Sequence, residues 1–511
     1  MKRLRTKILS LSNESDLPAV LNQLAKKFEV EESGASSEDR TYYDTFDWRL
    51  YRDHLVFFSS GGRLSLQRFS GRNIAEGPGR KRVRYLVSDI GSQKLSAHLK
   101  KRIEMRALVP IVEVATLATE FRIMNRDRKT VARMSLRDDQ PAHSDATLPE
   151  LVAITEIRGY EQEFESIADC FEKRGCESIK KRHLVQRLLD QGERLPEHYG
   201  DKFNVVLAPD VKIGQAVVQI CLHLVDDMKT NEPGIIDDID TEFLHDFRIA
   251  LRRTRSLLSL MKNVLPAESG AYFQKELGWL GSVTGPLRDL DVYLLEKDNY
   301  LDLLPKSLRS GMHCFFEQIE SRRADEIKIL QKHLASPRYA NLIGDWRVFL
   351  EQPDSGLHDG AGADRCRDFA DRLILKRFNS FLRHGNAIDD SSPDKTLHKL
   401  RIRGKKFRYL LEFFKSFYDQ KEMDAFLKHM KKLQDNLGTF NDLSVQQDML
   451  TAELEALRGR NMESLRFAAS LGGLVGILSE KHKAVRAQFE STYAAFAQPQ
   501  VRSILYSLVE N

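Results

Sequence analysis

The feature that most constrains this chain is an internal repeat in its C-terminal half. When this half is aligned on itself with an offset of 153 residues, two separate blocks come into register without a gap. The first block pairs 245–258 with 398–411, and the second pairs 285–292 with 438–445. Because chance rarely reproduces the same spacing twice, we interpret the repeat as a duplicated helical unit whose matching faces oppose each other across a pseudo-two-fold axis.

Hydrophobic periodicity divides the chain into two parts. Residues 1–190 contain short runs typical of β-strands between turn signals, for example 64–69, 83–87 and 131–136, and two amphipathic helices at 17–28 and 161–174. We therefore expect an α+β domain built on an antiparallel β-barrel or tunnel-like sheet. Residues 191–210 are the expected linker.

From 211 to 511 apolar residues recur at helical spacing, which predicts an all-α domain of two pseudo-symmetric four-helix bundles. The first copy covers about 211–336 and the second about 362–495. The eight predicted helices span roughly 211–229, 240–263, 269–296, 303–334, 362–384, 393–418, 421–452 and 461–494.

Composition narrows the class of protein. With 511 residues, 41% of them hydrophobic and 30% charged, the chain is expected to fold into two or three domains. We expect no membrane helix, because no apolar run is long enough to span a membrane. We also expect no signal peptide, because the basic N-terminus has neither an apolar h-region nor a small-residue cleavage site. The five cysteines are scattered and never at CxxC spacing, which favours a reducing cytoplasm over a disulfide framework or a zinc site.

Each copy of the repeated helix carries its cations on one face. At 100° per residue, the side chains fall within an arc about 80° wide, which holds His245, Arg248, Arg252 and Arg255 in the first copy and His398, Arg401, Lys405 and Arg408 in the second. Like charges at this spacing destabilise a helix by a few tenths of a kcal/mol per pair. Because the arrangement occurs twice, we infer that a long polyanion binds between the two helices, with strong salt dependence. The alternative is a pair of solvated basic faces.

Further charged residues could belong to the same groove. The repeated Asp289 and Asp442 are interpreted either as carboxylates that orient the cations or as surface or capping acids. Cations of neighbouring helices could extend the groove or be ordinary surface charges, and these are Arg322, Arg323, Lys328, Arg372, Lys376 and Arg377.

The repeated signature resembles the CHAD domain (conserved histidine α-helical domain). It consists of His-x-x-Arg-Ile-x-x-Arg-Arg-x-Arg followed by Arg-Asp-Leu-Asp-Val, and of His-x-x-Arg-Ile-x-x-Lys-Lys-x-Arg followed by Asn-Asp-Leu. The resemblance covers about 300 residues and implies two four-helix bundles around a basic cavity that binds inorganic polyphosphate, often with association to polyphosphate granules. The implied ligand positions are His245, Arg248, Arg252, Arg253, Arg255, His398, Arg401, Lys405, Lys406 and Arg408.

The N-terminal half resembles the CYTH family, a triphosphate tunnel fold of eight antiparallel strands that often precedes a CHAD domain. The resemblance rests on Tyr-Tyr-Asp-Thr-Phe-Asp-Trp-Arg-Leu at 42–50. The family begins with Glu-x-Glu-x-Lys, whose acids hold a divalent metal, but this chain has Arg3-Leu4-Arg5-Thr6-Lys7. Arg133 likewise stands where the family tends to place an inward Glu, and only Glu156 remains of a second acidic pair.

We therefore expect a non-catalytic relative with no metal and no cofactor. Its tunnel either binds phosphate through basic residues or is purely a scaffold; the basic candidates are Arg3, Arg5, Lys7, Arg63, Arg68, Arg122 and Arg133.

The sequence thus favours a polyphosphate-binding protein without turnover, located in the cytoplasm and, by the resemblance, on polyphosphate granules. The first alternative is a metal-dependent triphosphatase or polyphosphatase that uses the N-terminal tunnel, but it needs acids that the sequence lacks. The second is a nucleic-acid-binding protein. It is disfavoured because the chain has no RNP motif, helix-turn-helix signature or zinc finger, and the repeated helices have few aromatic residues for base stacking.

Overall fold

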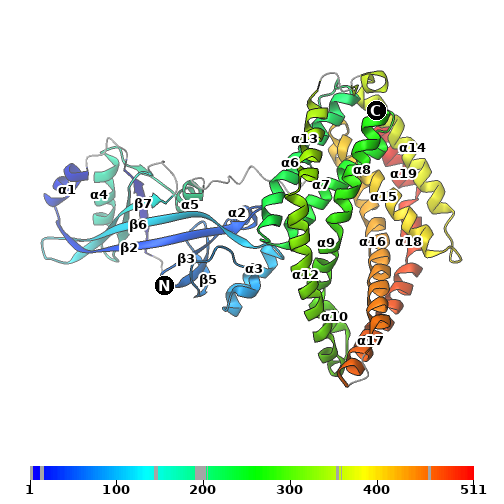
Figure 1. Ribbon diagram of the computed structural model, residues 1–511. Helices are drawn as coiled ribbons and strands as arrows, with labels where there is room; N and C mark the ends of the chain where they lie inside the picture. The colour runs from blue at the N-terminus through cyan, green and yellow to red at the C-terminus, as the bar shows by residue number, and fades with distance from the viewer. Residues whose placement is uncertain are drawn as a thin grey trace. The chain divides into compact units, whose positions relative to one another are not determined.

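The protein forms two compact units, Met1–Lys202 and Phe203–Asn511 (Figure 1). The computed structural model describes residues 4–11, 17–142, 148–189, 203, 205–352, 356–357, 359–458 and 462–510, and for 181–184 it describes the backbone alone. Arg3 and most of the predicted linker at 191–210 lie outside these residues. No helix in the described ranges is long and apolar enough to cross a membrane.

The first unit is built on a nine-stranded antiparallel sheet in the order β5-β4-β3-β2-β6-β7-β8-β1-β9. Two strands of 17 residues each, β2 and β6, run side by side through its centre. This confirms the antiparallel α+β class. The strands are β1 (Thr6–Ser10), β2 (Glu29–Thr45), β3 (Leu55–Ser60), β4 (Arg63–Arg68), β5 (Asn73–Pro78), β6 (Leu108–Met124), β7 (Thr130–Pro141), β8 (Leu151–Glu156) and β9 (Glu177–Ser178).

Helices pack against the sheet near β1, β7 and β8 and near β3 and β4. The predicted helices at 17–28 and 161–174 are confirmed as α1 (Leu17–Ala25) and α4 (Glu161–Glu172), which share a core with β1, β7 and β8. Three further helices are α2 (Arg49–Arg52), α3 (Gln93–Ile103) and α5 (Lys181–Leu189). The strand predicted at 83–87 is wrong, since only Tyr85 forms an isolated bridge, to Leu108.

Apart from an isolated β-bridge between Lys212 and Arg365, the described residues of the second unit form helices and their connections, as predicted, and the helix bounds display the repeat. Helices α6 and α14 begin 153 residues apart, as do α7 and α15, while α12 and α17 end 153 residues apart. The α-helices are α6 (Ile213–Ile236), α7 (Thr241–Leu260), α8 (Ala267–Val283), α9 (Gly285–Leu295), α10 (Lys297–Leu303), α11 (Lys306–Arg309), α12 (His313–Leu334), α13 (Pro337–Glu351), α14 (Cys366–Asn386), α15 (Asp394–Phe414), α16 (Gln420–Ala456), α17 (Met462–Ala487), α18 (Phe489–Phe496) and α19 (Pro499–Glu510).

The two copies differ where their sequences differ. The helix predicted at 269–296 is divided into α8 and α9 at Thr284, because Pro286 lacks an N–H group and its ring clashes with the preceding turn. In the second copy Thr439 occupies the equivalent position, and α16 runs through without interruption. Each copy also ends in helices that the periodicity did not indicate, namely α13 in the first and α19 in the second.

The two copies contact each other in several places, including between α6 and α14. Helices α7 and α15 pack directly against one another. A separate apolar cluster joins Tyr293, Phe315 and Phe316 of the first copy to Leu450 and Leu474 of the second. Figure 1 shows the first copy in green and the second in yellow to red. The repeated faces of α7 and α15 are thereby brought together at the centre of the unit.

Candidate anion-binding site

Local packing fixes which faces of α7 and α15 carry the cations. Helix α7 buries Phe243, Phe247 and Leu251, so the repeated cations lie on its remaining face. Helix α15 is oriented in the same way by its own apolar residues. Gly404, which weakens α15 locally, allows close packing, since a Cβ atom there would lie 3.2 Å from the ring of Phe381.

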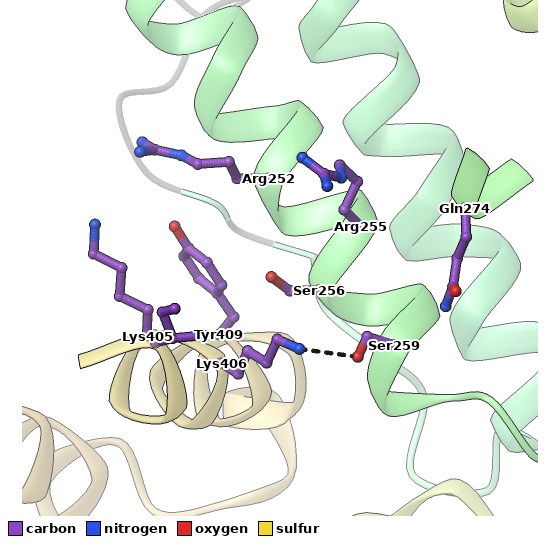
Figure 2. A pocket seen from close by; sticks show the side chains of 9 residues that line it. Arg252, Arg255, Ser256, Ser259, Gln274, Lys405, Lys406 and Tyr409 are labelled. Carbon is purple, nitrogen blue, oxygen red and sulfur yellow. Dashed lines mark hydrogen bonds between the residues drawn. The ribbon is translucent and has the colours of Figure 1, made fainter. Parts of the chain in front are cut away.

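A cavity of about 330 Å³ lies between these two helices. Figure 2 shows Arg252 and Arg255 reaching it from α7 and Lys405 and Lys406 from α15. Four of the predicted cations, two from each copy, therefore line one cavity. The complete lining is Arg252, Arg255, Ser256, Ser259, Gln274, Ile402, Lys405, Lys406 and Tyr409.

Arg252 and Lys405 are equivalent residues of the two copies, 153 positions apart. Within the described part of the chain, neither forms a hydrogen bond or an ion pair, and the Nε atom of Arg252 is buried without a partner. Burial, together with the positive charges of Arg401 and Arg252, lowers the pKa of Lys405 to about 8. Because a buried polar group without a partner is unfavourable, this pair is the centre of the candidate site.

The positive charge of Arg252 lowers the pKa of other cations in both copies. Burial first, and then the charge of Arg252, lowers the pKa of Arg248. The pKa values of Arg288 and Arg401 are also lowered, mainly by burial, and Arg252 contributes to both shifts against nearby carboxylates. These residues therefore form a cationic cluster whose mutual repulsion an anion would relieve.

The repeated aspartates lie beside the same repeated arginine. Arg401 Nη2 donates to Asp442 Oδ1 at 3.2 Å. In the first copy, burial raises the pKa of Asp289 against the charge of Arg248, while Arg248 Nη1 donates to Thr284 Oγ1 at 2.8 Å. The two arginines are thus held by neighbouring groups, and the predicted orienting role of the aspartates stays a prediction.

The two histidines do not line the cavity. His398 is exposed, and its Nδ1 atom contacts Asn441 Oδ1, next to Asp442. His245 is half-buried on α7. Ligand contact by either ring stays a prediction.

Two predicted ligand residues, Arg253 and Lys406, join the two helices, and a third, Arg408, pairs within α15. Arg253 Nη2 donates to Glu412 Oε2 at 3.1 Å, and Lys406 Nζ donates to Ser259 Oγ at 3.0 Å. Arg408 Nε lies 3.2 Å from Glu412 Oε1. Arg253 and Arg408 therefore share one carboxylate, whereas Lys406 is bonded only to a hydroxyl group.

The cations predicted to extend the groove fall into two groups. Arg322 binds Glu453 through both terminal nitrogens, and Arg323 binds both Asp291 and Asp238 at 2.7 Å, so these two are engaged in ion pairs. Lys376 and Arg377 are exposed on α14. The charge of Arg377 contributes, after burial, to lowering the pKa of Lys406, which places Arg377 within electrostatic reach of the cavity.

In the first unit, the candidate tunnel residues are divided between the two faces of the sheet. Arg5 and Lys7 lie on the sheet face that α4 covers, where Arg5 binds Glu156 and Glu165 at 2.7 Å and Lys7 binds Glu172 at 2.8 Å. Arg133 lies on the opposite face, in register with Arg122 and Thr155. In the parts of the chain that are described, no group of three or more His, Cys, Asp and Glu side chains is placed to hold a metal ion.

The acids of the 42–50 segment have a structural role. The carboxylate of Asp44 accepts hydrogen bonds from the backbone N–H groups of Thr45, Leu50 and Tyr51 at 2.7–2.9 Å. Asp47 binds Arg49 at 2.8 Å and lies 3.7 Å from the buried Arg106. This segment therefore marks a buried turn before α2 and not a metal site.

Sequence reasoning missed Ser259, Glu412 and Tyr409. A signal was available for the first two, since they occupy equivalent positions of the two copies, four residues after Arg255 and Arg408 respectively. Tyr409 is almost fully buried, so its pattern in the sequence is that of a core residue, yet it lines the cavity.

Comparison with known proteins identifies the helical unit. Residues 219–451 match the family model of the CHAD domain, and this part of the chain is a CHAD domain. The crystal structure of the CHAD domain from the plant Ricinus communis is similar, with 24% identity and a TM-score of 0.48 over 58% of this chain and 97% of that one. PptA from Streptomyces chartreusis is also similar, with 15% identity and a TM-score of 0.45 over 55% of this chain and 99% of that one. No curated protein matches the chain.

Proposed function

We propose that the protein binds inorganic polyphosphate, or a similar linear polyanion, in the cavity between α7 and α15, without chemical turnover. The observation that carries the proposal is the pair Arg252 and Lys405, two equivalent cations that line one cavity without a hydrogen bond or ion pair from the described residues. A polyphosphate located there supplies the missing acceptors. It also removes the repulsion among the surrounding arginines.

The chemistry of the cavity favours phosphate oxygens over nucleobases. Its cations are arginine and lysine, which bind phosphate by bidentate hydrogen bonds and as point charges. Its single aromatic residue, Tyr409, is 5% exposed and offers no free face on which a base could stack. We also propose that the protein lies in the cytoplasm on polyphosphate granules.

Titration of the full chain with sodium polyphosphate at several salt concentrations tests the proposal. We expect an affinity that rises with chain length and falls steeply with salt, because binding releases counterions. The double variant Arg252→Ala with Lys405→Ala is expected to weaken binding at least a hundredfold. A matched control, Arg347→Ala with Lys332→Ala, removes the same charges away from the cavity and should bind like the wild type.

Two results would contradict the proposal. One is equal binding by the double variant and its control. The other is displacement of bound polyphosphate by an equal concentration of single-stranded nucleic acid at the same ionic strength, which would favour the nucleic-acid alternative.

A further inference from the structure

Positions 259 and 412 are equivalent in the two copies but carry different residues, a serine and a glutamate. Each accepts a hydrogen bond from the opposite helix, and the donors, Lys406 and Arg253, are themselves equivalent. The α7–α15 interface therefore has one bond on each side of the pseudo-two-fold axis. On one side the acceptor is neutral, and on the other it is charged.

This difference changes the charge on the two sides. Glu412 forms ion pairs with two cations, since it lies 3.1 Å from Arg253 and 3.2 Å from Arg408, and its charge cancels one of their two positive charges. Ser259 carries no charge, so Lys406 and the nearby Arg255 keep theirs without a carboxylate between them. Burial and the charge of Arg255 both lower the pKa of Lys406, in agreement with unrelieved repulsion on this side.

The cavity lies on the serine side. Its lining includes Arg255, Ser259 and Lys406, but not the equivalent residues Arg408, Glu412 and Arg253. The hydrogen bond from Lys406 to the hydroxyl group of Ser259 has no opposite charge to strengthen it, so a phosphate can replace it. The charged and partly buried pair of Arg253 and Glu412 is harder to break.

We infer that this serine–glutamate difference makes the polyanion site one-sided. Glu412 closes one half of a pseudo-symmetric cationic surface to phosphate, and Ser259 leaves the other half open. Glu412 and Ser259 are thus specificity-determining positions, and Glu412 acts by holding Arg253 and Arg408. The inference rests on the proposed function, because it states where in that site the anion binds.

Two mirrored variants of the full chain test the inference. In Ser259→Glu, the new carboxylate should bind Lys406 and Arg255 as Glu412 binds Arg253 and Arg408. We expect at least a tenfold loss of polyphosphate affinity. The salt slope should fall by about 0.7, since the new carboxylate cancels one positive charge and each cation contributes about 0.7. In Glu412→Ser, the released arginines should raise the affinity and steepen the slope by a similar amount.

Neutral substitutions separate charge from size. Ser259→Gln adds the bulk of glutamate without its charge and should keep most of the affinity, while Glu412→Gln removes the charge at constant size and should steepen the salt slope. Thermal unfolding of each variant, followed by circular dichroism, reports whether the fold is retained. If Glu412→Ser does not fold, Glu412→Gln still measures the released charge.

The outcomes distinguish this inference from the proposed function. The inference would be overturned if Ser259→Glu and Ser259→Gln lost the same affinity, or if both Glu412 variants kept the wild-type salt slope. The proposed function would still stand in either case, provided that the wild-type chain binds polyphosphate. Failure of the wild-type chain to bind polyphosphate would overturn both.

Discussion

Lys405 of α15 lies within electrostatic reach of Arg252, its equivalent on α7, and both side chains line the same cavity. Repeating one basic helix has therefore placed two like charges beside the same cavity. Such a contact destabilises the free protein and favours any state in which an anion lies between the two groups. The duplication explains why the site combines cations that are distant in sequence.

The first prediction concerns the pH dependence of binding. The pKa of Lys405 is about 8, so the ammonium group is mostly charged at pH 7 and mostly neutral at pH 9. Since a bound polyanion favours the charged form, affinity should fall as the pH rises through 8, by up to about tenfold between pH 7 and 9. Titrations with polyphosphate at constant ionic strength measure this fall.

Lys405→Arg provides the matched control for this prediction. A guanidinium group stays charged throughout the range, so the variant should bind with little change between pH 7 and 9. The same fall in wild type and variant would show that another group titrates.

The second prediction is that Lys405 reduces the stability of the free protein. Its pKa lies below the model-compound value of 10.5, so between about pH 8 and 10.5 the unfolded chain binds more protons than the native one and stability rises with pH. Lys405→Met has no charge to bury, and should raise the free energy of unfolding at pH 7 by about 1 kcal/mol, after allowance for solvent screening.

Urea denaturation with and without polyphosphate measures this effect. We expect the variant to be more stable than the wild type without the ligand and to gain less when the ligand is added. A variant less stable than the wild type at pH 7 would contradict the prediction.

The third prediction concerns Arg323, which is an ion-pair residue in the structure. It binds Asp291, whose side chain is 1% exposed, and Asp238. Arg323→Ala leaves a buried carboxylate unpaired and should lower the free energy of unfolding by about 3 kcal/mol. Adding Asp291→Ala should restore part of this loss, because no buried charge is then left unpaired. Additive losses in the double variant would contradict the assignment.

Helical periodicity and the 153-residue offset predicted α7, α15 and the direction of their basic faces, because these features depend on residues close together in sequence. The partners of Arg322 and Arg323 could not be predicted, since Glu453 reaches Arg322 from α16 and Asp238 reaches Arg323 from the turn between α6 and α7. Four of the ten implied ligand cations and histidines line the cavity as a result.

In the first unit the sequence was less informative. The first half of β2 has few apolar residues, so a strand of 17 residues carried no clear alternation. The cations of the first strand were predicted to point into a tunnel, alongside Arg133. The strand register places them on the other face. Thr155 pairs with Arg133 on one side and with Thr6 on the other, so Thr6 shares the face of Arg133 and Lys7 points to the opposite face. One residue of shift decides the face in a β-sheet.

The last prediction is that the full chain does not hydrolyse tripolyphosphate with Mg²⁺ or Mn²⁺. Metal-assisted phosphoryl transfer needs carboxylates that converge on the metal. Glu156 is held by Arg5 on the face that α4 covers, and Arg133 stands on the opposite face beside Arg122. Asp44 and Asp47 are engaged by backbone N–H groups and by arginines.

We expect phosphate release no faster than in a protein-free blank with the same metal. Steady release that is proportional to protein concentration and stopped by a chelator would contradict the prediction and restore the triphosphatase alternative.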